Sequence, residues 1–204
     1  MPRVTTIRRR RPGDSAVDVV LDSGDIVRIH DRRLVEHRLS PGMTLGAAGV
    51  HALRQAAAAD AAERRALRLI ARRPRAEAEL RARLAGWGVD AVTAAGVLER
   101  LAELGQVDDR RLAVAVTEAR HEQGYGRLRT AHDLARLAVD EPAAAEALET
   151  LPDDERPAAE RIARRRFGPP PYDDGTARRA AAFLARRGFD PEAVAAAVGL
   201  PVPD

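Results

Sequence analysis

A short motif occurs three times along the chain, at a constant spacing of 50 residues and without a gap. The segments Leu84–Asp90, Leu134–Asp140 and Leu184–Asp190 each begin with Leu-Ala and end with an apolar residue followed by Asp. Self-similarity at such a period is typical of architectures in which one supersecondary unit is stacked on the next. The chain is therefore expected to fold as a repeat protein.

Each element of the motif has a mechanical role in joining two helices. The leucine is expected on the buried face of a helix, and Gly88 and Gly188 can supply the left-handed residue that closes it. The aspartate is expected to cap the next helix, and Pro191 suits a first helical position. One repeat then reads helix, break, helix, tight turn, helix. Because three short helices enclose only a small core, neighbouring repeats should stack.

The predicted fold class is mainly α, with three tandem three-helix repeats in an elongated curved array behind a small β extension. Three β-branched runs separated by Gly-Asp turn clusters lie within the first 30 residues and indicate a hairpin or three-strand sheet. A short helix is expected at 31–39 and a long one at 45–73. The predicted segments are 1–45 (β-rich extension), 46–63 (helical connector), 64–106, 107–152 and 153–204 (repeats 1 to 3).

Composition excludes several classes of protein. There is no cysteine among the 204 residues, so disulfides and thiolate metal sites are excluded. No apolar run reaches the roughly 20 residues that span a bilayer, and the start is basic without a signal-peptide pattern. We expect a cytoplasmic protein without contact to a membrane.

Charge is strongly segregated although the net charge is only +3. All basic side chains are arginine; residues 61–86 hold eight arginines against three glutamates, and residues 156–187 hold nine against three acids. Residues 139–155 carry seven acids and no base. Such asymmetry favours a polyanionic partner for part of the surface, or else a set of solvated helix faces.

Two stretches of this sequence resemble the RecX family. They are residues 66–84, which contain Arg73-Pro74-Arg75 and Glu79-Leu80, and residues 101–113, which contain Val107-Asp108-Asp109-Arg110-Arg111. Arg120 and Gly124-Tyr125-Gly126-Arg127 follow in the same pattern, and residues 39–45 are similar to an N-terminal extension of some members. Departures from the family pattern are Ala76 for Ser, Leu112 for an aromatic residue and Arg127 for Pro.

The resemblance implies a non-enzymatic regulator of the RecA recombinase in DNA repair, homologous recombination and the SOS response. Members of the family are tandem three-helix proteins that bind in the groove of the RecA–DNA filament and curb its ATPase, strand exchange and growth. The implied partners are the RecA filament and single-stranded, possibly double-stranded, DNA, with the protein a monomer. The alternative from the residues alone is a helix-turn-helix DNA-binding protein or transcriptional regulator that acts without RecA.

The candidate DNA- or filament-binding residues are arginines around two helix breaks, together with one tyrosine. Phosphate contact by such a set would make binding salt-dependent and insensitive to base sequence. The competing interpretation is surface pairing with Glu77, Glu79, Glu118 and Glu122 at helical spacings. The candidates are Arg72, Arg73, Arg75, Arg81, Arg83, Arg110, Arg111, Arg120, Tyr125, Arg127 and Arg129.

No catalytic, cofactor or metal site is predicted. Asp108 and Asp109 are explained by a helix start, as a cap and a first-turn acid. The Gly124-Tyr125-Gly126 segment is expected to be a helix break, because it lacks the strand and the Lys-Ser/Thr of a phosphate loop. Trp87 is expected in the core, and the five histidines show no metal-ligand spacing.

Overall fold

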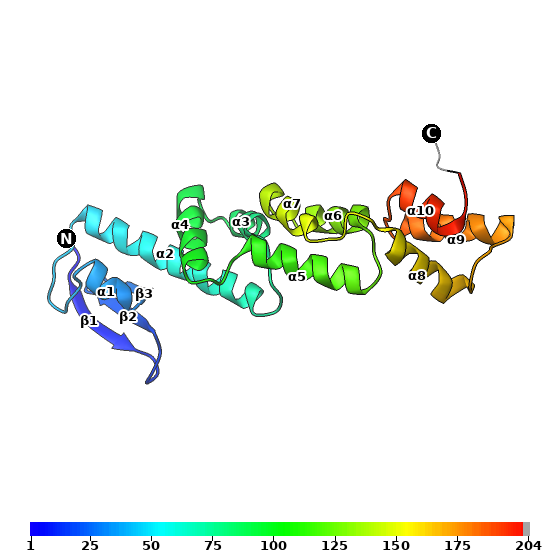
Figure 1. The fold of residues 1–204 in the computed structure, drawn as a ribbon. Coiled ribbons are helices and arrows are strands. Elements are labelled where there is room, and N and C mark those ends of the chain that lie inside the picture. The colour runs from blue at the N-terminus through cyan, green and yellow to red at the C-terminus, as the bar shows by residue number, and fades with distance from the viewer. Residues whose placement is uncertain (202–204) are drawn as a thin grey trace. The chain divides into compact units, whose positions relative to one another are not determined.

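The computed structural model describes residues 1–201, which form ten helices and one three-stranded sheet (Figure 1). The chain divides into two compact units. The first unit comprises Met1–Pro74 and Leu80–Val107, and the second comprises Arg75–Glu79 and the chain from Asp108 onward. The mainly helical fold class with a small N-terminal sheet is confirmed.

The sheet of the first unit is antiparallel, in the order β1-β2-β3. Its strands are β1 (Val4–Arg9), β2 (Ala16–Leu21) and β3 (Ile26–His30). In the central strand, Val17 pairs with Arg9 on one side and with Ile29 on the other. The β-branched runs formed strands because their turn clusters at 12–14 and 22–25 allow the chain to reverse. Helix α1 (Arg32–Glu36) follows and is shorter than the predicted segment 31–39.

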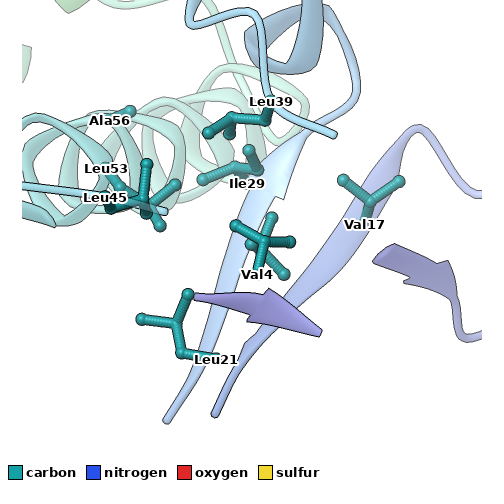
Figure 2. Close-up of a cluster of buried hydrophobic side chains, with 9 residues drawn as sticks. Val4, Val17, Leu21, Ile29, Leu39, Leu45, Leu53 and Ala56 are labelled. Carbon is teal, nitrogen blue, oxygen red and sulfur yellow. The ribbon is translucent and has the colours of Figure 1, made fainter. Parts of the chain in front are cut away.

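The sheet packs on the long helix α2 (Ala47–Ile70) through a cluster of apolar side chains (Figure 2). Val4, Val19 and Ile29 from the strands are fully buried, and Leu53 of α2 is 1% exposed. Burying each such side chain contributes roughly 1.5–3 kcal/mol. A small sheet that would be marginal alone is thereby stabilised on a helix.

The sheet and α1, residues 4–36, are called the β-module below. A buried ion-pair cluster also holds this β-module against α2. The carboxylate of Asp60, only 2% exposed, accepts a 2.6 Å hydrogen bond from the backbone N–H of His30. Arg32 and Arg33 each contact its Oδ1 at 3.2 Å. A buried carboxylate is tolerated when it is paired and hydrogen-bonded in this way.

The first unit also holds a helix trio formed by the C-terminal half of α2, the part of α3 (Glu77–Gly86) from Leu80 onward, and α4 (Ala91–Glu103). Leu80 and Leu84 of α3 pack against Leu98 and Leu101 of α4, and all four are at most 1% exposed. The interior between them is completed by small side chains of α2, which allow the helices to approach closely. The predicted burial of Leu84 is confirmed.

The second unit contains two further trios. The first consists of α5 (Asp109–Glu122), α6 (Arg127–Arg136) and α7 (Glu141–Glu149). The second consists of α8 (Arg156–Phe167), α9 (Asp174–Arg186) and α10 (Pro191–Val198). The repeated leucines, Leu134 and Leu184, are both fully buried in their respective cores.

The predicted cap chemistry of the repeated motif is present in all three trios. Asp90, Asp140 and Asp190 each accept a hydrogen bond from the backbone N–H three residues on, at 2.9, 3.0 and 2.8 Å. The residue two positions before each aspartate is left-handed, with φ of 77° at Gly88 and at Gly188. In the middle trio this position is Ala138, with φ of 58°. An alanine there carries a strain that glycine would not.

We predict that Ala138→Gly stabilises the second unit by about 0.5 kcal/mol, since the relief of left-handed strain exceeds the entropy gained by the unfolded chain. The matched change Gly88→Ala should destabilise the first unit by about 1 kcal/mol, because a Cβ there meets no atom within 4 Å and only strain acts. Urea titration followed by circular dichroism would measure both. Destabilisation by Ala138→Gly would contradict this account.

We also predict that Asp60→Ala destabilises the first unit by about 2 kcal/mol, because it leaves the backbone amide of His30 unpaired and removes one of the carboxylate partners of Arg32 and Arg33, which keep their pairs with Glu63 and Glu36. The control is Asp25→Ala, which breaks the exposed 3.4 Å pair with Arg54 and should cost less than about 1 kcal/mol. Fluorescence of Trp87, the sole tryptophan, reports unfolding of this unit. Equal costs for the two changes would refute the role given to Asp60.

Candidate nucleic-acid interface

Three arginine side chains converge on the ring of Tyr125 in the second unit. Tyr125 lies in the break between α5, which ends at Glu122, and α6, which begins at Arg127. The residue before it, Gly124, is left-handed, with φ of 74°. The guanidinium carbons of Arg120, Arg129 and Arg187 lie 5.5, 5.9 and 4.9 Å from the ring centroid. These distances are within the range of cation–π attraction. The predicted helix break therefore presents a tyrosine ring to a group of cations.

One buried carboxylate forms ion pairs with two of these three arginines. Asp133, which is 2% exposed, lies 2.8 Å from Nε of Arg120 and 3.4 Å from Nε of Arg129. Arg187 instead donates from Nη1 to the carbonyls of Gln123 and Gly124, at 2.7 and 2.9 Å. With one carboxylate against three guanidinium groups, the cluster keeps a local positive charge. Such a surface attracts an anion.

The two trios of the second unit meet through direct backbone contact. Gly126 donates its N–H to the carbonyl of Arg187 at 2.9 Å, and Leu128 donates to that of Gly188 at 3.0 Å. A Cβ on Gly126 would overlap the carbonyl of Gly188, and a Cβ on Gly188 would overlap the backbone of Arg129. Both glycines are required by this close approach. The junction therefore fixes where Arg187 stands relative to Tyr125.

A carboxylate completes the same junction by accepting two backbone amides. Glu155, 8% exposed, accepts from the N–H of Arg127 at 2.6 Å and from that of Asp190 at 3.0 Å. It thus binds the first residue of α6 and the cap residue of α10 at once. Carboxylates that accept backbone amides at helix starts make strong, charge-assisted hydrogen bonds.

Asp109 repeats this arrangement one trio earlier. It accepts from the N–H of Glu77 at 2.8 Å and from that of Asp140 at 3.2 Å. Burial raises the pKa of Asp109 above its usual value, while the hydrogen bonds from these two amides oppose that shift. Asp108 caps α5 by accepting from Arg111 N–H at 2.9 Å, as predicted. The bridging role of Asp109 was missed, because its partners are distant in sequence.

Several of the predicted arginines have structural partners. Arg127 donates to the carbonyls of Leu148 and Leu151, at 2.8 and 3.3 Å, and so satisfies the last turn of α7. Arg110 forms an exposed ion pair with Glu146 at 3.2 Å. Arg75, which lies just before α3, pairs with Glu79 four residues on, which agrees with the competing interpretation.

The other predicted arginines lie at the surface of one unit or the other. Arg73 donates to the carbonyl of Pro74 at 3.2 Å. Those in the first unit are Arg72, Arg73, Arg81 and Arg83, and Arg111 lies in the second, all with exposed side chains. The contacts described above gather Arg120, Tyr125 and Arg129 of the predicted set into one cluster, together with Arg187, which the prediction omitted. A role for the whole set in DNA binding stays a prediction.

Trp87 does not lie in the core as expected. Its side chain is 39% exposed, and the guanidinium of Arg65 lies 5.5 Å from its ring centroid. The corresponding positions in the other trios hold Leu137 and Arg187. This position lies at the rim of each trio, where an aliphatic, aromatic or charged side chain can be accommodated.

Among residues 1–201, no helix is both long enough and apolar enough to cross a membrane.

The fold and its junctions define a protein of tandem three-helix repeats that follow a small β-module. Comparison with known proteins is consistent with this class: residues 62–101 match the family model described as RecX, first three-helix domain. The chain is 40% identical over 142 residues to regulatory protein RecX of Halorhodospira halophila, covering 69% of this chain and 88% of that protein. It is 39% identical over 127 residues to regulatory protein RecX of Xanthomonas campestris pv. campestris, covering 62% and 78%. The chain belongs to the RecX family, and the resemblance seen in its sequence is confirmed.

Two solved structures share the fold. A crystal structure of regulatory protein RecX aligns with a TM-score of 0.74 at 18% identity, covering 95% of this chain and 97% of that one. A crystal structure of RecX from Lactobacillus salivarius aligns with a TM-score of 0.60 at 15% identity, covering 69% and 94%. The first alignment covers nearly the whole chain, and therefore the N-terminal β-module has a counterpart in a solved relative.

We predict that Glu155→Gln destabilises the second unit by about 1–3 kcal/mol. The glutamine oxygen can accept one amide, but its NH₂ group would face the other N–H, which is itself a donor. Glu149→Gln, an exposed change of the same kind at the end of α7, is the matched control and should shift stability by less than about 0.5 kcal/mol. Circular dichroism during urea unfolding measures both, and equal effects would contradict the bridge.

Proposed function

We propose that this protein binds the filament that a RecA-type recombinase forms on DNA and thereby inhibits its ATPase, strand exchange and growth. Membership in a family of regulatory proteins supports a regulatory role. The observation that carries the proposal is the cluster of three guanidinium groups around Tyr125, served by one buried carboxylate. It offers a fixed positive surface to a partner that displays phosphates and acidic side chains.

The proposed mode of action is binding, with no bond made or broken. Arginine forks match phosphate and carboxylate oxygens bidentately, so the same surface suits both components of a nucleoprotein filament. Contacts to phosphates contribute affinity without reading bases, and a regulator of a filament that forms on any sequence needs this property. We propose that the protein acts as a monomer in the cytoplasm, on filaments formed during recombination and the SOS response. Single-stranded DNA, and possibly duplex DNA, is its nucleic-acid partner.

The remaining predicted residues are proposed as separate contacts to the same polymer. Exposed arginines of the first unit, such as Arg72 and Arg83, would add charge-assisted contacts to the same polymer. Each exposed contact contributes little by itself, whereas several along one polymer add to the affinity and to its salt dependence. Tyr125 would act by holding arginine side chains in place.

We predict that sub-stoichiometric additions of the protein lower the ATPase rate of a bacterial RecA on single-stranded DNA. Arg129→Gln removes one guanidinium of the cluster and should raise the concentration for half-inhibition by about tenfold, the effect of one lost charged hydrogen bond. Arg136→Gln makes the same charge change on the same helix, outside the candidate set, and should inhibit as the unmodified protein does.

Two results would remove the proposal. One is an unchanged ATPase rate together with no co-sedimentation of the protein with the filament. The other is sequence-selective binding to duplex DNA that needs no recombinase, which would favour the helix-turn-helix alternative instead.

A further inference from the structure

The arginine cluster at Tyr125 continues into the last trio as an alternating row of rings and guanidinium groups. Arg187 lies 4.9 Å from the centroid of Tyr125 and 5.0 Å from that of Phe183. Arg166 lies 4.8 Å from the centroid of Phe183 and 5.8 Å from that of Phe167. The two phenylalanine rings meet edge to face at 5.7 Å. We define the arginine–aromatic row as these residues together with Arg120 and Arg129.

The rings hold the guanidinium groups of the row in place. Arg187 contacts a ring of each trio and is also fixed by its hydrogen bonds to two carbonyls. Arg166 contacts two rings of the last trio while its side chain remains exposed. A free arginine loses rotamer entropy on being ordered, and stacking has already reduced this cost before any ligand arrives.

The charge of the row is offset by little acid. Asp133 contacts only Arg120 and Arg129, at the α5–α6 end of the row. The partners of Arg187 and Arg166 in the row are ring faces and carbonyls, which leave their charge in place. Residues 156–187 hold nine arginines against three acids, so the surroundings of this end are also basic. The row is therefore a continuous series of fixed positive groups.

We propose that the arginine–aromatic row binds the phosphodiester backbone of a nucleic-acid strand, so that this strand, rather than the recombinase subunits, contacts the last two trios. The inference rests on the proposed function and assigns one component of the filament to one surface. A continuous series of guanidinium groups suits a polymer with an anion at every step. Guanidinium groups already lie against the faces of these rings, so the row contacts phosphates without stacking on bases.

The test measures binding of the full chain to a fluorescent oligothymidylate by anisotropy, at several NaCl concentrations. Arg166→Gln should weaken binding several-fold and make the slope of log K against log salt shallower by about 0.7, the value for one lost phosphate contact on a single strand. Phe183→Leu keeps an apolar side chain but removes the ring, and should weaken binding by freeing both neighbouring arginines. Arg161→Gln alters an exposed arginine five positions earlier on α8, on a different side of that helix, and should keep the slope of the unmodified protein.

Three results would overturn the inference: no salt-dependent binding of the unmodified protein, identical slopes for Arg166→Gln and the unmodified protein, or equal losses for Arg166→Gln and Arg161→Gln. The inference would also be overturned if the Arg166→Gln variant lost binding to a recombinase that carries no DNA, because the partner of the row would then be an acidic protein surface.

The ATPase assay is scored separately. Inhibition that persists without strand binding would leave the proposed function standing, whereas strand binding without inhibition would sustain the row and remove the filament role.

Discussion

The structure depends on carboxylates that accept two backbone amides where one trio meets another. Glu155 binds the amides of Arg127 and Asp190, and Asp109 binds those of Glu77 and Asp140. In both cases the partners are related by the 50-residue period, so the bridge is part of the repeat. Helix starts carry amides that no helical carbonyl can accept. Joining two such starts on one carboxylate satisfies both and fixes the stacking of the helices.

The first trio follows the β-module and not another trio, and its carboxylate at the equivalent position has different partners. Glu63 precedes Asp109 by the same 46 residues that separate Asp109 from Glu155. Its carboxylate contacts Arg32 at 2.5 Å and Arg100 at 3.6 Å, where its counterparts accept backbone amides. Arg32 belongs to α1 of the β-module. A guanidinium from that module therefore supplies donors to this carboxylate, as backbone amides do in the later trios.

Local features of this chain could be predicted from the sequence and long-range ones could not. The aspartate caps, the left-handed glycines and the helix break at Tyr125 depend on backbone dihedrals and on amides within three residues, so a short motif specifies them. The partner of an arginine depends instead on which helix packs against it. Arg120 and Arg129 meet at Asp133, whereas the competing interpretation of the sequence paired the predicted arginines with glutamates such as Glu118 and Glu122. The same limit applies to Trp87, whose place at the rim depends on the packing of its trio.

The segregation of charge in the sequence has a physical explanation in the fold. Acids between Val139 and Glu155 perform tasks of folding: Asp140 caps α7, Glu155 bridges two helix starts, and Glu146 pairs with Arg110. Both oxygens of Glu155 accept backbone amides rather than guanidinium groups. In the following trio, Arg166 and Arg187 lie against rings, and Arg187 also donates to carbonyls. Such contacts order a guanidinium without removing its charge. A chain of small net charge can in this way keep a concentrated positive surface, because some of its negative charges are used at helix starts and in a junction.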